Sequence, residues 1–347
     1  MPQDLGGIAN PLFEKITWQT ASDWDNAVDQ EGVVHIDDID RDTAGAGTIQ
    51  LGYPNEDQWG NALTHYYPHD RSSGDLLDKI GSNNGTPDYG VKQNASGVFG
   101  SSAWQYDGDD DRTYMDSNII RGDGGSFTFA FWFQGLRGGS RDLFYSQNKD
   151  YLEFKSTNSI GGDGGNVNIP DTNTALNLNE WYHVTYTVDS GNYLYIYLDG
   201  VEESKEPSSG GSIRQGNPRF SDHSDGSFKA NVRMEELRYY DRALSASEVA
   251  SLADPSGHLT TDTKSFNNPQ KPELDFLDYT LNGETIEIDV IGSPGTGSEE
   301  TVSQDLDGAA SYSLEWSNSH TDFRLKIKPS TEDVEVTPTL SSASLEP

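Results

Sequence analysis

Residues 126–135 read SFTFAFWFQG, and this stretch decides the fold. A phenylalanine stands at every second position, 127, 129, 131 and 133, with threonine, alanine and tryptophan between them. Because successive side chains of a strand point to opposite faces, one face is aromatic and the other mixed, as in a sandwich of two sheets. Residues 181–200 read WYHVTYTVDSGNYLYIYLDG, and the turn residues Asp189 to Asn192 predict a β-hairpin over Trp181–Leu198.

The composition of the whole chain favours the same class. Its 347 residues predict two or three domains. Hydrophobic residues make up only 33%, but 11% aromatic residues distinguish the chain from a disordered one. The 36 glycines and 15 prolines favour many short strands joined by turns. We therefore expect an all-β protein.

The charge excludes several kinds of partner. Asp and Glu number 57 and Lys and Arg 23, which gives a net charge of −34. This field repels phosphate backbones and anionic membrane faces, so we expect no nucleic-acid partner. We interpret the acidic excess as an adaptation to concentrated salt, where screening removes the mutual repulsion of the carboxylates. An ordinary acidic extracellular protein is the alternative.

Other features narrow the chemistry further. The chain has no cysteine, which excludes disulfides, thiolate catalysis and cysteine-bound metals. No segment approaches eighteen uncharged apolar residues, so we expect no membrane insertion. The first thirty residues lack the pattern of a signal peptide, and we expect a soluble chain that is not exported.

Shifts in composition divide the chain into four parts. We predict an N-terminal arm or docking region at 1–62, a jelly roll at 63–255, a linker at 256–271, and an Ig/fibronectin-like sandwich at 272–347. Ser245 and Glu248 form a capping box that predicts a helix over Ala246–Ala253, and Trp316 is a predicted core residue of the last domain. Its predicted strands are Leu274–Thr280, Thr285–Ile291, Thr301–Leu306, Tyr312–Trp316, Phe323–Ile327 and Val334–Leu340.

The motifs of most enzyme classes are absent from the sequence. We find no G-x-S-x-G, H-E-x-x-H or G-x-x-x-x-G-K-[ST] motif. Glu273, Asp275 and Asp278 resemble the E-x-D-x-x-E active-site strand of laminarinase-type β-glucanases, except that the last residue is Asp. This near-match falls outside the predicted jelly roll, and simple strand alternation explains it equally well. We therefore expect a protein that is not an enzyme.

Several segments between residues 63 and 254 resemble a known family. They are YPHD (67–70), DKIGSNNGT (78–86), WQYDGDDD (104–111), EWYHV (180–184), YIYLDG (195–200) and EELRYYDRALS (235–245). In combination they are similar to LamG-like jelly rolls of the concanavalin A-like lectin/glucanase superfamily. The resemblance implies an antiparallel two-sheet jelly roll that usually binds rather than cleaves, often with a structural calcium ion.

The resemblance also implies where calcium would bind. Asp78, Asn83, Asn84 and Glu235 match the family's oxygen ligands, and calcium takes about six to eight oxygens in such loops. Glu235 replaces the more usual Asp, and the loop before Asp78 is shorter than in the family. Asp107, Asp109 and Asp111 are secondary candidates. A turn rich in Asn and Gly with no bound ion is the alternative.

Glycan recognition requires exposed aromatic faces beside polar groups. Trp59, Trp104, Tyr145 and Phe220 lie near loop-like sequence and are candidate glycan-binding residues. Each of them is equally suited to the core, because aromatic residues are the main core material of this chain.

The whole chain resembles surface proteins of tailed viruses of haloarchaea, which form capsid turrets, decorations or tail-fibre parts. We expect a homo-oligomer on the virion surface that contacts other virion proteins and host-surface glycans. A secreted or cell-surface carbohydrate-active enzyme, or its carbohydrate-binding accessory module, is one alternative. A purely structural decoration protein is the other.

Overall fold

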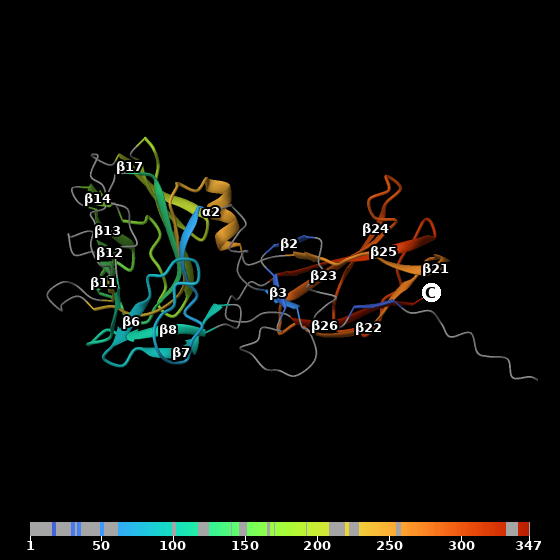
Figure 1. Ribbon diagram of the computed structural model, residues 1–347, viewed down its shortest axis with the longest axis horizontal. Helices are drawn as coiled ribbons and strands as arrows, with labels where there is room; N and C mark the ends of the chain where they lie inside the picture. Colours follow the sequence, from blue (N-terminus) through green and yellow to red (C-terminus); the bar gives the residue numbers. More distant parts are fainter. Residues whose placement is uncertain are drawn as a thin grey trace, which may run out of the picture. The chain divides into compact units, whose positions relative to one another are not determined.

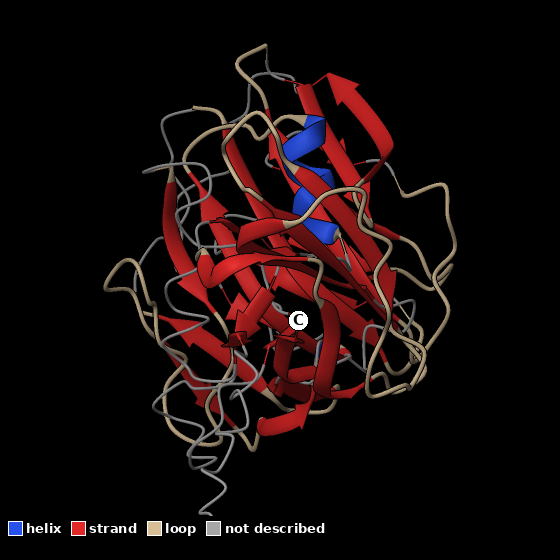
Figure 2. Ribbon diagram, turned by 90° about the vertical axis from the view of Figure 1, so that its right-hand side faces the viewer, coloured by secondary structure: helices blue, strands red, loops and turns tan. Residues whose placement is uncertain are grey.

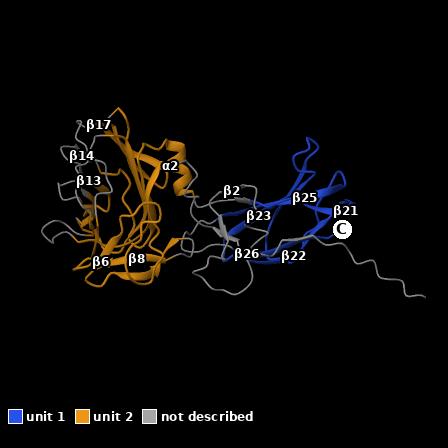
Figure 3. Ribbon diagram, viewed as in Figure 1, with its two compact units in different colours: residues 1–52, 255–347 blue, residues 53–254 orange. Residues whose placement is uncertain are grey.

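A computed structural model of the chain describes most of its residues. The described parts are four short strands before residue 52 and residues 62–98, 102–116, 125–139, 141–145, 151–164, 167–169, 171–191, 193–207, 219–221, 229–254, 258–330 and 339–346. Strands dominate these parts, as Figure 2 shows. The chain forms two compact units, residues 53–254 and residues 1–52 together with 255–347, which Figure 3 distinguishes by colour. Residues 53–254, unit 2 in Figure 3, are therefore inserted into unit 1.

The inserted unit is built from two antiparallel sheets, labelled in part in Figure 1. The eight-stranded sheet has the order β17 (Val201–Pro207), β16 (Tyr193–Leu198), β15 (Trp181–Val188), β10 (Phe127–Gly135), β19 (Asn231–Tyr240), β8 (Ser102–Asp107) and β7 (Lys92–Ser96), and β5 (Leu63–Tyr67) also pairs with β19. The seven-stranded sheet has the order β14 (Val167–Ile169), β13 (Ile160–Gly164), β12 (Tyr151–Phe154), β11 (Arg141–Tyr145), β18 (Arg219–Phe220), β9 (Arg112–Met115) and β6 (Gly85–Asp88). This arrangement confirms the predicted jelly-roll sandwich.

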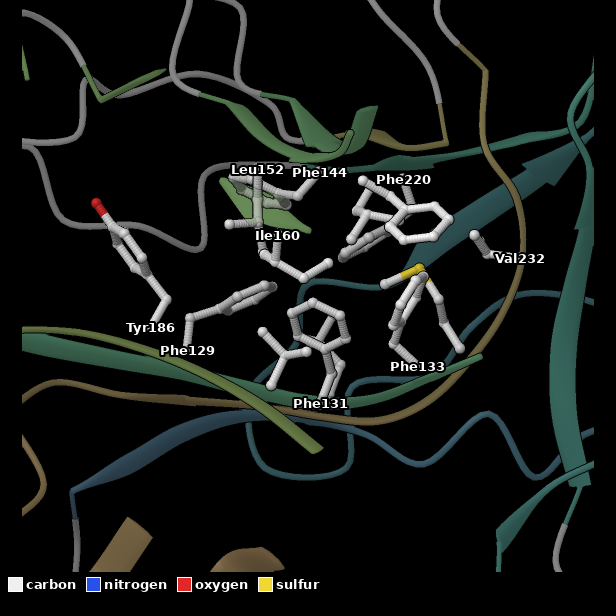
Figure 4. Packing of buried hydrophobic residues seen from close by; sticks show 14 of the residues in the cluster. Phe129, Phe131, Phe133, Phe144, Leu152, Ile160, Tyr186, Phe220 and Val232 are labelled. Atoms are coloured by element: carbon white, nitrogen blue, oxygen red, sulfur yellow. The ribbon is translucent and has the colours of Figure 1, made fainter. Parts of the chain in front are cut away.

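The core between the two sheets is aromatic. The side chains of Phe129, Phe131 and Phe133 point from β10 toward Phe144 and Phe220 of the other sheet, as Figure 4 shows. The ring centres of Phe129 and Phe144 are 5.1 Å apart. Every residue of β10 is buried, because the second face of the strand is covered as well.

The helix α2 (Ala246–Ala253) contributes to that cover. Its residues Val249 and Leu252 pack in one cluster with Ala130 of β10 and Tyr197 of β16. The capping box is formed as predicted, with the N–H of Glu248 donating to the Ser245 side chain and the N–H of Ser245 donating to Glu248. Among the described residues, no helix has the length and apolarity needed to cross a bilayer.

Unit 1, residues 1–52 and 255–347, is also a two-sheet sandwich. One sheet has the order β1 (Ile16–Trp18), β26 (Thr339–Glu346), β4 (Ile49–Leu51) and β3 (Val33–His35), with β22 (Glu273–Thr280) also pairing with β26. The other has the order β2 (Asp29–Glu31), β20 (His258–Thr260), β25 (His320–Ser330), β23 (Thr285–Gly292) and β24 (Glu300–Asp305), with β21 (Lys264–Gln270) pairing with β25. Leu274, Ile288, Phe323 and Leu345 share its core with Trp316, which confirms the prediction for that residue.

Two predicted segments and one predicted strand differ from this architecture. The segment predicted as an arm, 1–62, supplies β1, β3 and β4 to one sheet and β2 to the other, so these strands belong to the second sandwich. The segment predicted as a linker, 256–271, contains β20 and β21, which pair with β25. Tyr312, in the segment between β24 and β25, makes an isolated bridge to Leu274 where a strand was expected. Most of the predicted strand Val334–Leu340 lies outside the described residues.

Candidate functional site

The loop between β5 and β6 is organised around one buried carboxylate. Oδ1 of Asp78 accepts the backbone N–H groups of Tyr66 at 3.2 Å, Ile80 at 3.3 Å and Gly81 at 2.9 Å. Oδ2 of Asp78 accepts the N–H of Asn83 at 3.2 Å and lies 2.6 Å from Nδ1 of His65. Burial raises the pKa of Asp78, but the hydrogen bonds from His65 and the backbone outweigh burial and leave the pKa below its ordinary value.

These contacts test whether the loop fits a calcium ion. An ionised carboxylate offers about four lone-pair sites, and the Asp78 carboxylate already has five donors around it. The side-chain oxygen of Asn84 accepts the N–H of Asp78 at 3.0 Å, and the carbonyl oxygen of Asn83 accepts the hydroxyl of Tyr67 at 2.8 Å. Glu235 is buried on β19 and accepts the N–H of Val98. The Asp78 carboxylate therefore does not fit a calcium ligand, because five hydrogen-bond donors surround its oxygens.

The acidic residues that follow β8 form a second loop. Asp107, Asp110 and Asp111 are the one group of three acidic or histidine side chains in the described ranges whose ligand atoms lie within 4.8 Å of one another. Burial and the neighbouring carboxylates of Asp107 and Asp110 raise the pKa of Asp111 to about 6, although the N–H of Asp107 and the ammonium of Lys229 act in the opposite direction. Asp109 is not in this group and lies 3.8 Å from Arg137. The cluster has the charge for a cation but no further feature that identifies one.

A buried ion pair lies at a bulge in β19. Glu236 has a positive φ of 55°, and the pairing of β19 with β10 shifts register at this point. Oε1 of Glu236 accepts the hydroxyl of Tyr66 at 2.8 Å, and Oε2 accepts Nη2 of Arg238 at 3.0 Å. Burial raises the pKa of Glu236 to about 7, while Arg238 and Tyr66 act in the opposite direction. Sequence reasoning missed this pair, although both residues lie in the segment EELRYYDRALS (235–245), because regular strand alternation does not predict the bulge that brings their side chains together.

The structure does not expose the predicted glycan-binding aromatics. Trp104 and Phe220 are 0% exposed and Tyr145 is 2% exposed. Phe220 packs on Phe144, and the Trp104 ring meets the edge of the His69 imidazole. This corrects the prediction for these three residues, because strands β8, β11 and β18 turn them inward or cover them. Trp59 lies outside the described residues.

Exposed aromatic rings occur instead at two other places on the jelly roll. Tyr89, which follows β6, is 57% exposed, and the Arg112 guanidinium lies 4.5 Å from its ring centre. Tyr193 at the start of β16 is 41% exposed, and Nζ of Lys205 lies 4.7 Å from its ring centre. Lys205 lies 4.8 Å from the ring centre of Tyr195 as well. The alternation Tyr193-x-Tyr195 on a strand was the sequence signal that could have predicted the exposed aromatic ring at Tyr193.

The near-match to a glucanase strand lies in the other unit. Glu273, Asp275 and Asp278 are on β22, which pairs with β26. Register shifts between Asp275 and Asp278 interrupt the regular alternation that an E-x-D-x-x-E strand requires. Oε1 of Glu273 accepts the hydroxyl of Ser313 at 3.0 Å. These carboxylates are therefore separate from the jelly roll.

Comparison with known proteins agrees with the fold of the inserted unit. Residues 107–250 match the model of the concanavalin A-like lectin/glucanases superfamily. The inserted unit is thus a domain of the concanavalin A-like lectin/glucanase fold. No curated protein matches the sequence.

Several solved structures are similar to part of the chain. Trypanosoma rangeli sialidase in complex with sialic acid has 15% identity and a TM-score of 0.43, over 58% of this chain and 34% of the sialidase. Domain 4 of AbnA, a GH43 extracellular arabinanase from Geobacillus stearothermophilus in complex with arabinotriose, has 20% identity and a TM-score of 0.42, over 55% of this chain and 98% of that domain. The heptameric SAP-like pentraxin of Limulus polyphemus has 14% identity and a TM-score of 0.35, over 41% of this chain and 75% of the pentraxin. This chain thus spans about a third of the length of the sialidase.

Proposed function

We propose that the chain is a non-enzymatic surface protein whose jelly roll binds glycans, and that it belongs to the virion of a haloarchaeal virus. In that setting it forms part of a turret, a decoration or a tail fibre, as a homo-oligomer in contact with other virion proteins. The host-surface glycan is the ligand of the jelly roll.

One observation carries the glycan-binding part of this proposal. Tyr89 and Tyr193, the exposed tyrosines among the described side chains of the jelly roll, are each held against a cation at 4.5–4.7 Å. A cation above a ring fixes the ring's orientation by about 0.5–1 kcal/mol at an exposed site. A ring that is fixed and exposed presents an apolar face to the C–H surface of a sugar at little cost in side-chain entropy. The polar groups beside it are suited to sugar hydroxyls.

The acidic groups of the jelly roll support binding over catalysis. Glycoside hydrolysis needs one carboxyl group with a raised pKa that reaches the substrate and a second, ionised carboxylate nearby. Burial raises the pKa of Asp111 and Asp199 to about 6 and that of Glu236 to about 7. Asp111 accepts the N–H of Asp107, and Asp199 accepts the N–H of His183. The Glu236 side chain is 4% exposed, and its two oxygens accept hydrogen bonds from Tyr66 and Arg238. Its environment is that of a structural ion pair.

The charge of the chain supports the high-salt setting. At a net charge of −34, mutual repulsion destabilises the compact state at low ionic strength. At about 1 M salt the Debye length falls to roughly 3 Å, so that this repulsion is screened. A virion released into brine meets that condition.

A screen of host-envelope polysaccharide fragments in molar NaCl tests the proposed function. We expect the wild-type chain to bind a subset of the fragments and the Tyr89→Ala/Tyr193→Ala variant to lose that binding while it keeps its circular dichroism spectrum. Absence of binding to every fragment would favour a structural decoration. Cleavage of laminarin that is lost in Glu273→Gln or Asp275→Asn would favour a carbohydrate-active enzyme.

A further inference from the structure

The clusters around the exposed tyrosines Tyr89 and Tyr193 differ in length and in the kind of cation. On the seven-stranded sheet, Tyr89, Arg112, Tyr114 and Arg219 form one alternating stack. The Arg112 guanidinium lies 4.5 Å from the ring centre of Tyr89 and 4.7 Å from that of Tyr114. The Arg219 guanidinium lies 4.7 Å from the ring centre of Tyr114. We propose that this stack is a binding site for acidic glycans, whose sugars carry carboxylate or sulfate groups.

Strand pairing places Arg112, Tyr114 and Arg219 on the neighbouring strands β9 and β18, and Tyr89 directly follows β6, the other neighbour of β9. Tyr114 of β9 is the Cα partner of Arg219 of β18, and Arg112 of β9 is the partner of Asp88 of β6. On β9 the side chains of Thr113 and Met115 are buried in the core. Because side chains of a strand alternate, Arg112 and Tyr114 lie on the opposite face of the sheet. The stack therefore crosses three adjacent strands on the face away from the core.

The stack prepares the arginines for an anionic ligand. A guanidinium that lies against aromatic rings keeps the N–H groups at its edge available for hydrogen bonds in the plane. It also loses part of its side-chain freedom before a ligand arrives, which lowers the entropic cost of binding. The planar fork of N–H donors matches a carboxylate or a sulfate, often with two parallel hydrogen bonds.

The acidic neighbour of Arg112 does not prevent this role. Oδ2 of Asp88 lies 3.2 Å from Nη2 of Arg112, and the Asp88 side chain is 44% exposed. The Arg112 side chain is 18% exposed, so the pair is partly buried, but a guanidinium has five N–H donors to share. A ligand carboxylate can therefore bind the same guanidinium beside Asp88 or in its place.

The cluster around Tyr193 is built for a different task. Its cation is Lys205, a point charge without a planar fork. Oδ2 of Asp189 accepts the hydroxyl of Tyr195 at 2.9 Å in the same cluster. The paired N–H donors that can bind a carboxylate or sulfate with two hydrogen bonds are thus found in the arginine stack.

The net charge of the chain predicts an unusual dependence of the binding affinity on salt. An acidic polysaccharide and a chain of charge −34 repel each other over long distances at low ionic strength. Salt screens this repulsion, and contact pairs in partly buried positions are screened much less. We therefore expect the affinity to rise between about 0.1 M and about 1 M NaCl, opposite to the usual trend for charged ligands.

The test is a calorimetric titration of the full chain in molar NaCl with an oligogalacturonate and with a cello-oligosaccharide of the same length. We expect Arg219→Gln and Arg219→Lys each to weaken oligogalacturonate binding by about tenfold, because both remove the fork and the second keeps the charge. Arg137→Gln is the matched control: it removes one positive charge from an exposed arginine of the same domain outside the stack, and it should bind as the wild type does.

The proposal rests on the proposed glycan-binding function, and the titration separates the two. If the wild type binds neither sugar and no fragment of the polysaccharide screen, the glycan-binding function itself fails. If it binds the neutral sugar more tightly, or if the Arg219 variants bind oligogalacturonate as tightly as the Arg137 control, glycan binding stands and the acidic-glycan site is overturned. An unchanged thermal unfolding midpoint in Arg219→Lys excludes misfolding as the cause of a loss.

Discussion

Nδ1 of His65 lies 2.6 Å from Oδ2 of Asp78, and the same carboxylate accepts four backbone N–H groups of the surrounding loop and strand. The carboxylate thus holds together a loop of nine residues, 78–86, for which the sequence leaves open a calcium site or an ion-free turn. Its negative charge organises the loop through these hydrogen bonds.

Replacement of Asp78 by Asn should destabilise the jelly roll. Asparagine keeps one acceptor oxygen but places an NH2 group against donors, which leaves at least one of them unsatisfied. We expect a loss of about 2 kcal/mol in the free energy of unfolding. Urea denaturation in molar salt measures it. The pKa of Asp78 lies below its unfolded value, so its contribution is present above about pH 4 and is lost as the pH falls further. An unchanged midpoint in Asp78→Asn would contradict this role.

Removal of calcium should leave this loop unaffected. Because donors surround both oxygens of Asp78, we expect the same thermal midpoint in excess calcium and in excess chelator. Differential scanning calorimetry in molar salt measures it, and Asp110→Asn controls for an ion held by the acidic cluster after β8. A calcium-dependent increase that disappears in Asp78→Asn and persists in Asp110→Asn would show that the sequence-based ligand set is right.

The buried pair of Glu236 and Arg238 should show strong coupling. Glu236→Leu leaves the Arg238 charge buried without its partner, and we expect a loss of about 3–5 kcal/mol. The double variant Glu236→Leu/Arg238→Met removes both charges and should recover most of that loss. A double-mutant cycle by urea denaturation measures the coupling. Additive effects of the two single variants would refute the pairing.

The cap of α2 should depend on pH. Hydrogen bonds from Arg242 and Ser245 lower the pKa of Glu248 from 4.5 to about 2, despite partial burial. The folded pKa is below the unfolded one, so the stabilisation is full above about pH 4.5 and is lost as the pH falls toward 2. Ser245→Ala should cost about 1 kcal/mol at neutral pH and nearly as much at pH 3, because a Glu248 with a pKa of about 2 is still ionised there. A cost that already disappears between pH 5 and pH 4 would exclude this lowered pKa.

Local patterns predicted the jelly roll well. The alternation of Phe127 to Phe133 depends only on the period of a strand, and the turn at Asp189 only on local backbone geometry, so both could be read directly. The capping box of Ser245 and Glu248 is equally local, since both partners lie within one turn of the helix.

Long-range pairing escaped prediction. The strand β1 pairs with β26 at the other end of the chain, and no local signal marks a domain that is interrupted by another one. The arginine stack is also a product of pairing, because Arg219 meets Tyr114 only through the register of β18 and β9. Burial of Trp104 and Phe220 depends in the same way on which sheet face each strand presents, which a loop-like sequence does not reveal.

The central claim, that the jelly roll binds glycans through its exposed tyrosines, can be tested by locating a bound polysaccharide. Hydrogen–deuterium exchange of the full chain in molar salt, with and without a saturating host polysaccharide, gives the location. The account predicts slower exchange at the turn after β6 and in β9, or at the start of β16, and no change in the sandwich of β22 to β26. Slower exchange confined to that sandwich, or none anywhere under saturation, would contradict it.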